Sequence, residues 1–111
     1  CSSALRAKET AEIFIAESGF KGKVEYLDTL YMAEPEQILA SIKQYGQDTK
    51  RIMVIGHNPG LETALQLFTR DVVSLPTASI AQIRFSVDDW QDVNGTSHGE
   101  LVELWRPRPA D

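Results

Sequence analysis

The pattern of apolar and polar positions predicts a chain in which helices and strands alternate. Apolar residues recur at helical spacing in three segments, which predicts helices at about 3–17, 35–46 and 59–69. We expect Ser2 or Ser3 to cap the first of these helices, and Gly19 to end it. Short apolar runs at 24–27 and 52–56 lie between the helices and predict strands, the second of them buried on both faces.

A different pattern follows the third helix. Apolar and polar residues alternate over 78–87, and a last apolar run covers 100–106, which predicts an antiparallel pair of strands joined by a long hairpin. The order of the elements indicates an α/β fold, a three-layer, mostly parallel sheet with helices on both faces and this hairpin at its C-terminal edge. The length of 111 residues predicts a single domain over 1–111.

Composition excludes several classes of function. The net charge is −5 and the chain has no run of Lys and Arg, so we expect no nucleic-acid partner. No apolar stretch reaches the length of a membrane span, so we expect no membrane partner. The single cysteine, Cys1, excludes an internal disulfide and is typical of a reducing compartment, which predicts a cytoplasmic protein. With one cysteine and two histidines, we expect no metal site.

His57 is the first candidate for chemistry. It follows the predicted strand at 52–56 and precedes Asn58 and Pro59, residue types that suit the start of a helix. Gly56 would permit a close approach of the backbone. In open α/β sheets ligands bind at the carboxyl ends of strands, and helix N-termini favour anions. The alternative is a histidine that only caps the helix or packs in the core.

Arg6 is the second candidate. It falls in the first turn of the first predicted helix, where the helix dipole disfavours a cation. A guanidinium there could face an anion that the same helix end attracts, because its fork matches phosphate oxygens. The alternative is a solvated arginine. If a strand ends at Cys1, parallel neighbours would bring Arg6 and His57 to one edge of the sheet.

Two blocks of sequence resemble a known family. The block at 2–11, Ser-Ser-Ala-Leu-Arg-Ala-Lys-Glu-Thr-Ala, is similar to the Ser-x-x-x-Arg-Ala-x-x-Thr-Ala block of the histidine phosphatase (phosphoglycerate mutase-like) superfamily. The block at 54–60, Val-Ile-Gly-His-Asn-Pro-Gly, is similar to its second histidine block. The segments Leu30-Tyr31 and 75–78 and the tail with Trp90 resemble the small SixA-type phosphohistidine phosphatases.

The resemblance implies a phosphatase that works through a covalent phosphohistidine, with no metal and no organic cofactor. In that family a histidine of an Arg-His-Gly motif on the first strand takes the phosphoryl group, and two arginines and a second histidine hold its oxygens. Carried over to this chain, Arg6 matches the second arginine and His57 the second histidine, as catalytic residues. Asn58 lies beside them as a substrate-binding donor.

The chain departs from the family at one point, because Arg-His-Gly does not occur in it. It opens at Cys1 without an initiator Met. We therefore expect that the nucleophile, the first arginine, the first strand and the first helix of a phosphoglycerate mutase-like fold belong to a missing N-terminal segment. The alternative is a product that has lost activity. The 111-residue chain alone would then be inactive, although the full-length enzyme would act as a hydrolase.

The substrate stays open between a protein phosphohistidine and a small phosphomonoester. Asp28 and Glu34, in the loop before the second helix, are the candidates for a proton donor to a leaving oxygen. SixA-type members resemble this chain in having no evident acid, which fits a phosphohistidine substrate. The alternatives are a mutase or small-molecule phosphatase on the same fold, and a non-catalytic anion-binding or interaction module.

Three further residues are predicted to serve structure only. His98 lies between a turn and the last predicted strand, and we expect it to be exposed and non-catalytic. Trp90 and Trp105 are predicted to pack against other residues rather than to form a ligand site.

Overall fold

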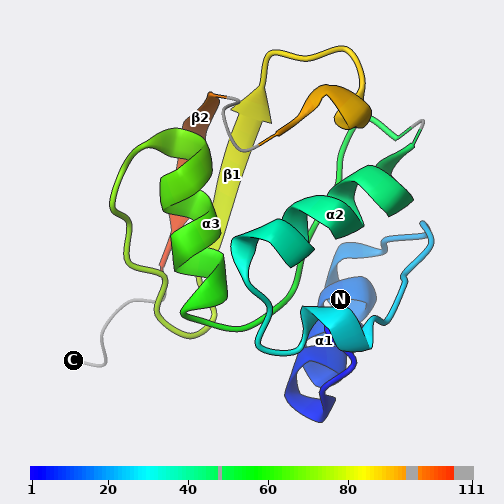
Figure 1. Cartoon of the computed structure of the whole chain (residues 1–111). Helices are drawn as coiled ribbons and strands as arrows, with labels where there is room; N and C mark the ends of the chain where they lie inside the picture. Colours follow the sequence, from blue (N-terminus) through cyan, green and yellow to red (C-terminus); the bar gives the residue numbers. More distant parts are fainter. Residues whose placement is uncertain (48, 95–97, 107–111) are drawn as a thin grey trace.

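A computed structural model describes residues 1–47, 49–94 and 98–106. It shows a small α/β domain in which three helices surround extended segments and a β-hairpin (Figure 1). In chain order, the elements are α1 (Leu5–Ser18), η1 (Asp28–Leu30), α2 (Pro35–Gly46), α3 (Gly60–Thr69), β1 (Ile80–Phe85), η2 (Trp90–Asp92) and β2 (Gly99–Trp105), where η marks a single turn of 3₁₀-helix.

The three predicted helices are confirmed, with bounds that differ by one or two residues. In α1 the small residues Ala7 and Ala11 are buried, and the helix ends at Gly19, whose φ of 71° is the left-handed conformation that glycine adopts without strain. The expected cap is wrong, because the N-cap is Ala4 and carries no side-chain bond. The Ser2 hydroxyl instead accepts a hydrogen bond from the Ala4 N–H at 3.2 Å, outside the helix.

The hydrophobic core lies between α2, α3 and the hairpin. Figure 1 shows α3 lying across the face of the β1–β2 hairpin, with α2 beside it. The rings of Phe68 on α3 and Phe85 on β1 meet edge to face with centroids 5.2 Å apart. Trp90 packs against Phe85 as predicted, whereas Trp105 is exposed. The buried residues of this core are Leu30, Ala33, Ile38, Ala64, Phe68 and Val93.

The antiparallel hairpin is confirmed, although β1 is shorter than predicted. Ile80 pairs with Trp105 and Phe85 with Gly99, and a bulge after Gln82 shifts the register. Side chains on β1 alternate between exposed and half-buried, as the sequence pattern indicates. The Asn94-Gly95 turn between the strands lies partly outside the described residues.

The predicted strands at 24–27 and 52–56 do not form as regular strands. Both segments are extended beside the first residues of the chain: Ser2 forms a parallel bridge with Leu27, and the Ser2 N–H donates to the Ile55 carbonyl at 2.9 Å. Residues 1–3 offer each segment only a short partner, which explains why no regular ladder develops. The prediction of burial on both faces is also wrong, because Met53 is 45% exposed.

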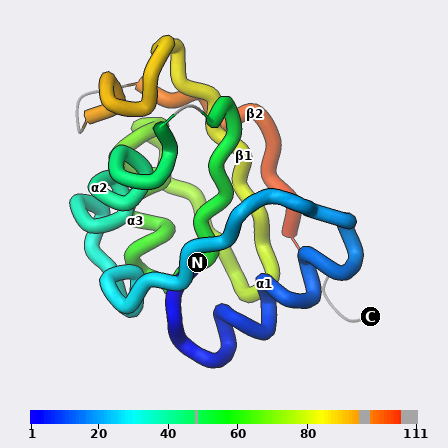
Figure 2. Tube along the Cα trace, turned by 90° about the vertical axis from the view of Figure 1, so that its right-hand side faces the viewer, coloured from blue at the N-terminus to red at the C-terminus, as the bar shows by residue number. Residues whose placement is uncertain are grey.

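Helices lie on two sides of these extended segments. Figure 2 shows α2 and α3 on one side and α1 toward the other. The regular sheet in the part of the chain that the structure describes has two antiparallel strands, so the mostly parallel sheet expected from the sequence is present only as the contacts of Ser2 with Leu27 and Ile55. In residues 1–47, 49–94 and 98–106, no helix is long and apolar enough to span a membrane.

Candidate functional site

His57 lies three residues before Gly60, the first residue of α3, and is half-buried. Its carbonyl accepts the Leu61 N–H at 3.1 Å, which fixes the backbone of His57 to the first turn of the helix. Its imidazole Nε2 lies 2.8 Å from the hydroxyl oxygen of Ser2. The histidine is therefore held both by the helix that follows it and by the start of the chain.

Ser2 brings the two sequence blocks together. Its backbone pairs with Leu27 on one side and with Ile55 on the other, so the residue lies between the two extended segments. Its side chain is completely buried, with 0% exposure, and contacts His57. Because Ser2 and Leu27 pair in parallel, the residues that follow them lie at one edge, and the contact of Ser2 with His57 places the residues after Ile55 at the same edge. These are the starts of η1, α1 and α3.

Tyr31 completes the surroundings of the histidine. Its ring meets the imidazole of His57 edge to face, with centroids 5.3 Å apart and an interplanar angle of 71°. The loop that carries Tyr31 packs closely on the start of α3, because a Cβ on Gly60 would lie 2.0 Å from the Ala33 carbonyl oxygen. The close approach expected at Gly56 occurs at Gly60 instead, since a Cβ on Gly56 would meet Leu61 at an ordinary 3.6 Å.

Asn58 fastens the start of α3 to a distant loop. Its side-chain amide donates to the Leu75 carbonyl at 2.6 Å, and its side-chain oxygen accepts the Glu62 N–H at 3.2 Å. The bond to the Glu62 N–H is of the kind that a capping side chain makes at the start of a helix, although the N-cap residue of α3 is Pro59. An amide nitrogen carries two hydrogens, so one donor of Asn58 remains beyond the bond to Leu75.

Arg6 is exposed in the first turn of α1, four positions after Ser2. Its carbonyl accepts from the Thr10 hydroxyl at 2.9 Å. Within the described residues its guanidinium forms no hydrogen bond or ion pair, so the charge is available to a ligand. The structure thus brings the segment that leads into α1 against His57, while the Arg6 side chain itself contacts neither His57 nor Asn58 through a hydrogen bond.

The two candidate acids differ in their surroundings. The Asp28 carboxylate, exposed at the start of η1, accepts a hydrogen bond from the Ser3 hydroxyl, which places it beside the first block. Glu34 precedes α2, where the Gln37 side chain accepts its backbone N–H at 2.8 Å. Asp28 is therefore the acid that the structure ties to the segment around Ser2.

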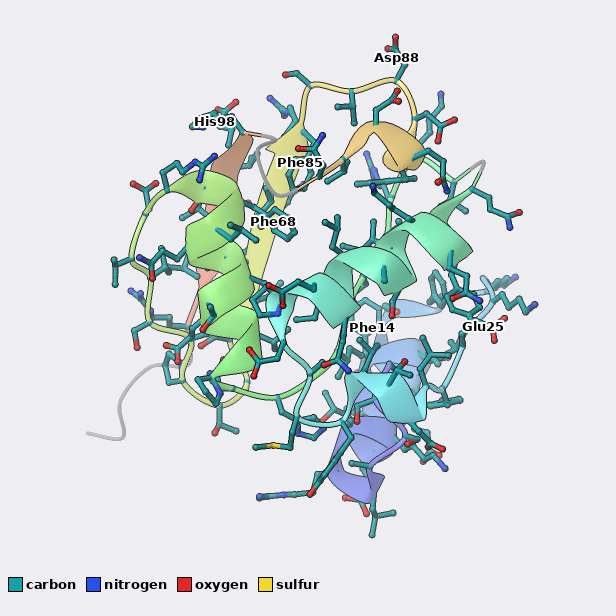
Figure 3. All side chains as sticks on the ribbon, viewed as in Figure 1. Phe14, Glu25, Phe68, Phe85, Asp88 and His98 are labelled. Carbon is teal, nitrogen blue, oxygen red and sulfur yellow. The ribbon has the colours of Figure 1, made fainter. Side chains whose placement is uncertain are left out.

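His98 lies away from this site. It directly precedes β2, and a Cβ on the next residue, Gly99, would lie 3.2 Å from the carbonyl of Phe68 near the end of α3. His57 precedes the other end of the same helix. Figure 3 shows His98 at the start of β2, near the C-terminal end of α3, and the residue is exposed as predicted.

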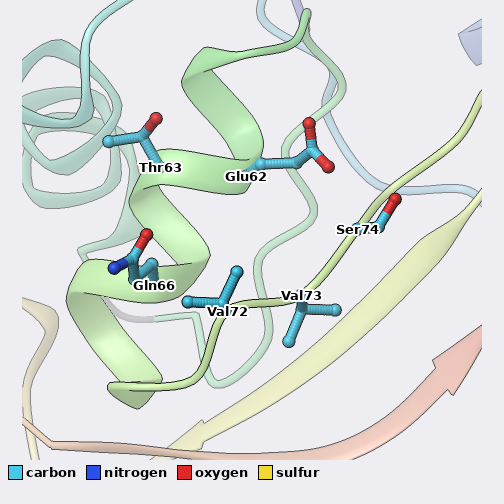
Figure 4. Close-up of a pocket in the computed structure, with 6 residues that line it drawn as sticks. All are labelled: Glu62, Thr63, Gln66, Val72, Val73 and Ser74. Carbon is cyan, nitrogen blue, oxygen red and sulfur yellow. The ribbon is translucent and has the colours of Figure 1, made fainter.

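A pocket of about 260 Å³ lies between α3 and the loop after it, and it borders the candidate site through the bond of Glu62 to Asn58. Figure 4 shows the six residues that line it, which are Glu62, Thr63, Gln66, Val72, Val73 and Ser74. Its one charged side chain, Glu62, accepts the Leu75 N–H at 2.8 Å. Its lining contains none of the candidate site residues, and a carboxylate in it opposes the binding of an anion, so we do not assign this pocket to the anion site.

Metal and cysteine chemistry add little to the site. No group of three or more His, Cys, Asp and Glu side chains that could hold a metal is found in the parts of the chain that the structure describes. The Cys1 amino group donates to the Glu25 carbonyl at 2.9 Å. Burial lowers the pKa of this amino group, and the nearby Glu25 carboxylate acts in the opposite direction.

Reasoning from sequence missed two residues of the site. Ser2 was expected only as a helix cap, and Tyr31 only as part of a loop that resembles a family. The position of Ser2 at the end of an extended segment, in the same block as Arg6, was the signal for its role. Nothing in the spacing of Tyr31 indicates that its ring contacts His57.

Comparison with known proteins gives distant relatives. An uncharacterized protein of Mycobacterium leprae (strain TN) is 28% identical over 118 residues, which cover 97% of the chain and 70% of that protein. Uncharacterized proteins of Mycobacterium tuberculosis strains CDC 1551 and H37Rv are 28% identical over 104 residues, or 84% of the chain and 63% of theirs. No protein-family model and no solved structure matches the chain.

Proposed function

We propose that the chain is the C-terminal portion of a phosphatase of the histidine phosphatase superfamily, similar to the SixA type. The observation that carries the proposal is the contact of 2.8 Å between Ser2 and His57, two residues from the two blocks that resemble the family. A phosphate site built from both blocks requires them to meet in space. The Ser2–His57 contact satisfies that requirement across almost half of the chain.

The local backbone also supports an anion site. Helix α1, of 14 residues, and helix α3, of 10 residues, both begin at the edge where the segments around Ser2 and Ile55 end. Helix N-termini carry a partial positive charge that favours a phosphate. In α3 this charge remains although the N–H groups of residues 61–63 are already bonded to His57, Asn58 and Pro59. Arg6 lies in the first turn of α1 with its guanidinium unpaired within the described residues.

The proposed reaction has two steps. A histidine of a segment that precedes Cys1 in the natural protein attacks the phosphorus, the bond from phosphorus to the leaving imidazole breaks, and that imidazole takes up a proton. Water then hydrolyses the enzyme phosphohistidine and releases inorganic phosphate. Arg6 and His57 hold the phosphoryl oxygens as their charge changes, and the remaining amide hydrogen of Asn58 is a third donor.

The phosphatase that we propose has further parts of its fold before Cys1 and acts in the cytoplasm. The preceding segment would supply the first strand and helix of a phosphoglycerate mutase-like domain, and the substrate would be a phosphorylated protein or small molecule of the cytoplasm. The chain spans 70% and 63% of the lengths of the relatives described above, which leaves room for such a segment.

One observation favours a second candidate, a phosphomonoesterase on the same scaffold. An alkoxide leaves less readily than an imidazole, so ester hydrolysis requires an acid near the leaving oxygen. The Asp28 carboxylate bonds to Ser3, next to Ser2, and is exposed. If the preceding segment holds no nucleophile, the third candidate applies, which is a non-catalytic anion-binding module.

The test uses the natural protein with its preceding segment. We expect it to release phosphate from a phosphohistidine peptide, and acid-labile, base-stable phosphate should stay on the enzyme after rapid quenching in base. Asp28→Asn should leave this reaction intact while lowering turnover of an alkyl phosphate, whose alkoxide leaves poorly, if esters are also substrates. A protein without turnover and without a phosphoenzyme on either substrate would contradict the phosphatase and favour the binding module.

A further inference from the structure

The hydrogen bonds around Ser2 determine which nitrogen of His57 carries its proton. A serine hydroxyl has one hydrogen to donate and two lone pairs to accept with, and a neutral imidazole has one N–H and one bare nitrogen. Ser2 Oγ already accepts the Ala4 N–H at 3.2 Å. The hydroxyl hydrogen of Ser2 therefore needs an acceptor of its own.

His57 Nε2 is the acceptor that the structure provides. Ser2 is 0% exposed, so water does not reach its hydroxyl, and Nε2 lies 2.8 Å away. If Nε2 instead carried the proton and donated to Ser2, the buried hydroxyl hydrogen would have no partner among the described residues, which is unfavourable. The satisfied arrangement has Ser2 donating to a bare Nε2.

We infer that Ser2 is a positioning residue that holds neutral His57 in the tautomer with its proton on Nδ1, so that the imidazole presents an N–H donor to an oxyanion ligand. The tautomer follows from the geometry alone, whereas its use toward an oxyanion rests on the proposed function. No hydrogen bond reaches Nδ1 from residues 1–47, 49–94 or 98–106, so this donor is available. The edge-to-face contact with Tyr31 adds a second restraint on the ring.

The arrangement has a chemical consequence. A histidine that presents a bare nitrogen to an oxyanion repels its lone pairs and binds it only after taking up a second proton. With the proton already on Nδ1, neutral His57 donates a hydrogen bond without a positive charge, and the charge at the site comes from Arg6. Ser2, which touches no ligand itself, thereby determines what His57 can offer.

The test is a nitrogen-15 NMR spectrum of the labelled 111-residue chain at about pH 9, above the ordinary titration range of imidazole. We expect long-range correlations of His57 to show a protonated Nδ1 and a bare Nε2. His98, the other histidine, is exposed and serves as an internal control that should average between tautomers. A proton mainly on Nε2 of His57, or an averaged ring like that of His98, would overturn the inference without any variant.

Variants then test whether Ser2 is the cause. Ser2→Ala should make the ring of His57 average between tautomers, and Ser2→Thr, which keeps the hydroxyl, should restore the proton to Nδ1. Ser3→Ala is the matched control, because the Ser3 hydroxyl donates to Asp28 and not to His57. A folded Ser2→Ala chain that keeps the proton on Nδ1 would overturn the role of Ser2. If Ser2→Ala does not fold, the spectra of the unaltered chain and of Ser2→Thr decide.

A titration with sulfate separates this inference from the proposed function. Sulfate is a tetrahedral dianion at neutral and alkaline pH, so its own charge does not change under the conditions of the titration. We expect it to shift the Nδ1 resonance of His57 and to leave His98 unchanged. If the tautomer is as inferred and sulfate has no effect on Nδ1, the tautomer stands while the oxyanion site, and with it the proposed function, is contradicted.

Discussion

The imidazole of His57 lies 2.8 Å from the hydroxyl of Ser2, although 55 positions separate the two residues in the chain. Three backbone contacts hold the two residues in place: Ser2 pairs with Leu27 and with Ile55, and the His57 carbonyl accepts the Leu61 N–H. The contact therefore joins the two extended segments, the start of α3 and the segment that leads into α1. A change at Ser2 should affect both the stability of the domain and the chemistry of the histidine.

Ser2→Ala should destabilise the domain. The change leaves the partly buried Ala4 N–H and His57 Nε2 without their partner, which costs about 1–3 kcal/mol in the free energy of unfolding. Denaturation in urea, followed by circular dichroism, measures it. Ser86→Ala is the control, since Ser86 is exposed and such surface changes stay within about 0.5 kcal/mol. Equal midpoints for the two variants would mean that the Ser2 hydrogen bonds contribute little.

Gly60→Ala should be harmful although alanine favours helices. An added Cβ would lie 2.0 Å from the Ala33 carbonyl, so the loop that carries Tyr31 must move, and overpacking of this kind costs about 1–3 kcal/mol. Gly56→Ala is the matched control, because its Cβ would meet Leu61 at 3.6 Å. Thermal melts of the two variants measure the difference. We also expect Gly60→Ala alone to shift the ring resonances of His57, since Tyr31 is displaced.

Asn58→Ala tests whether this side chain serves the fold or the ligand. The change removes the bonds to Leu75 and Glu62, and loss of a capping side chain costs about 0.5–2 kcal/mol. Asn58→Asp should also destabilise, because a carboxylate oxygen would face the Leu75 carbonyl where an amide donated. If the role is only structural, sulfate affinity measured by NMR in folded Asn58→Ala is unchanged. A weaker affinity there would support the predicted substrate-binding role.

The proposed catalytic residues are tested in a protein that includes the proposed preceding segment. His57→Ala should lower turnover of a phosphohistidine peptide by roughly 10²–10³, the usual effect of losing one preorganised donor in the transition state. Arg6→Lys should also lower it, because an ammonium does not reproduce the fork of a guanidinium. His98→Ala should stay within about twofold, since His98 is exposed near the other end of α3. Steady-state phosphate release measures all three.

The opposite ranking would refute this site. If His98→Ala were the damaging change and His57→Ala had no effect, the residues carried over from the family would be wrong. A non-catalytic anion-binding or interaction module would then become the leading proposal for the function of the chain.

Local patterns predicted most of the secondary structure. The three helices are amphipathic over at least two turns, and their buried positions, such as Ala7, Ala11, Ala64 and Phe68, fall at the expected spacing. The hairpin alternates cleanly over β1. These elements depend on residues that are close in the sequence, so the spacing of apolar residues is enough to predict them.

The remaining features depend on contacts between distant residues, which no local pattern contains. The runs at 24–27 and 52–56 have the composition of strands, but a strand exists only with a partner, and residues 1–3 provide each with a short one. The same holds for the site. The strand-to-helix context of His57 indicates its role, whereas its contact with Tyr31 follows from the packing of a loop on Gly60. The contact of Ser2 with His57 follows from the backbone pairing of residues 1–3 with the two extended segments.

The segment at 52–55 should exchange its amide hydrogens faster than the elements around it. Within the described part of the chain, its one backbone hydrogen bond is the Ile55 carbonyl accepting from Ser2, so its own N–H groups have no partner there. The amides of α3 and of the paired strands β1 and β2 are bonded and should open only with local or global unfolding. Hydrogen–deuterium exchange read by NMR gives the rate at each residue. We expect Met53, which is 45% exposed, to exchange at least tenfold faster than Leu65 in the middle of α3, as roughly 1.4 kcal/mol of opening free energy corresponds to each factor of ten.

If the preceding segment of the natural protein pairs with residues 52–55, as proposed, the same amides should become protected in that longer protein. Equal and fast exchange of Met53 in both proteins would show that no strand is added beside this segment, which would contradict the proposed fold while leaving the contact of Ser2 with His57 intact.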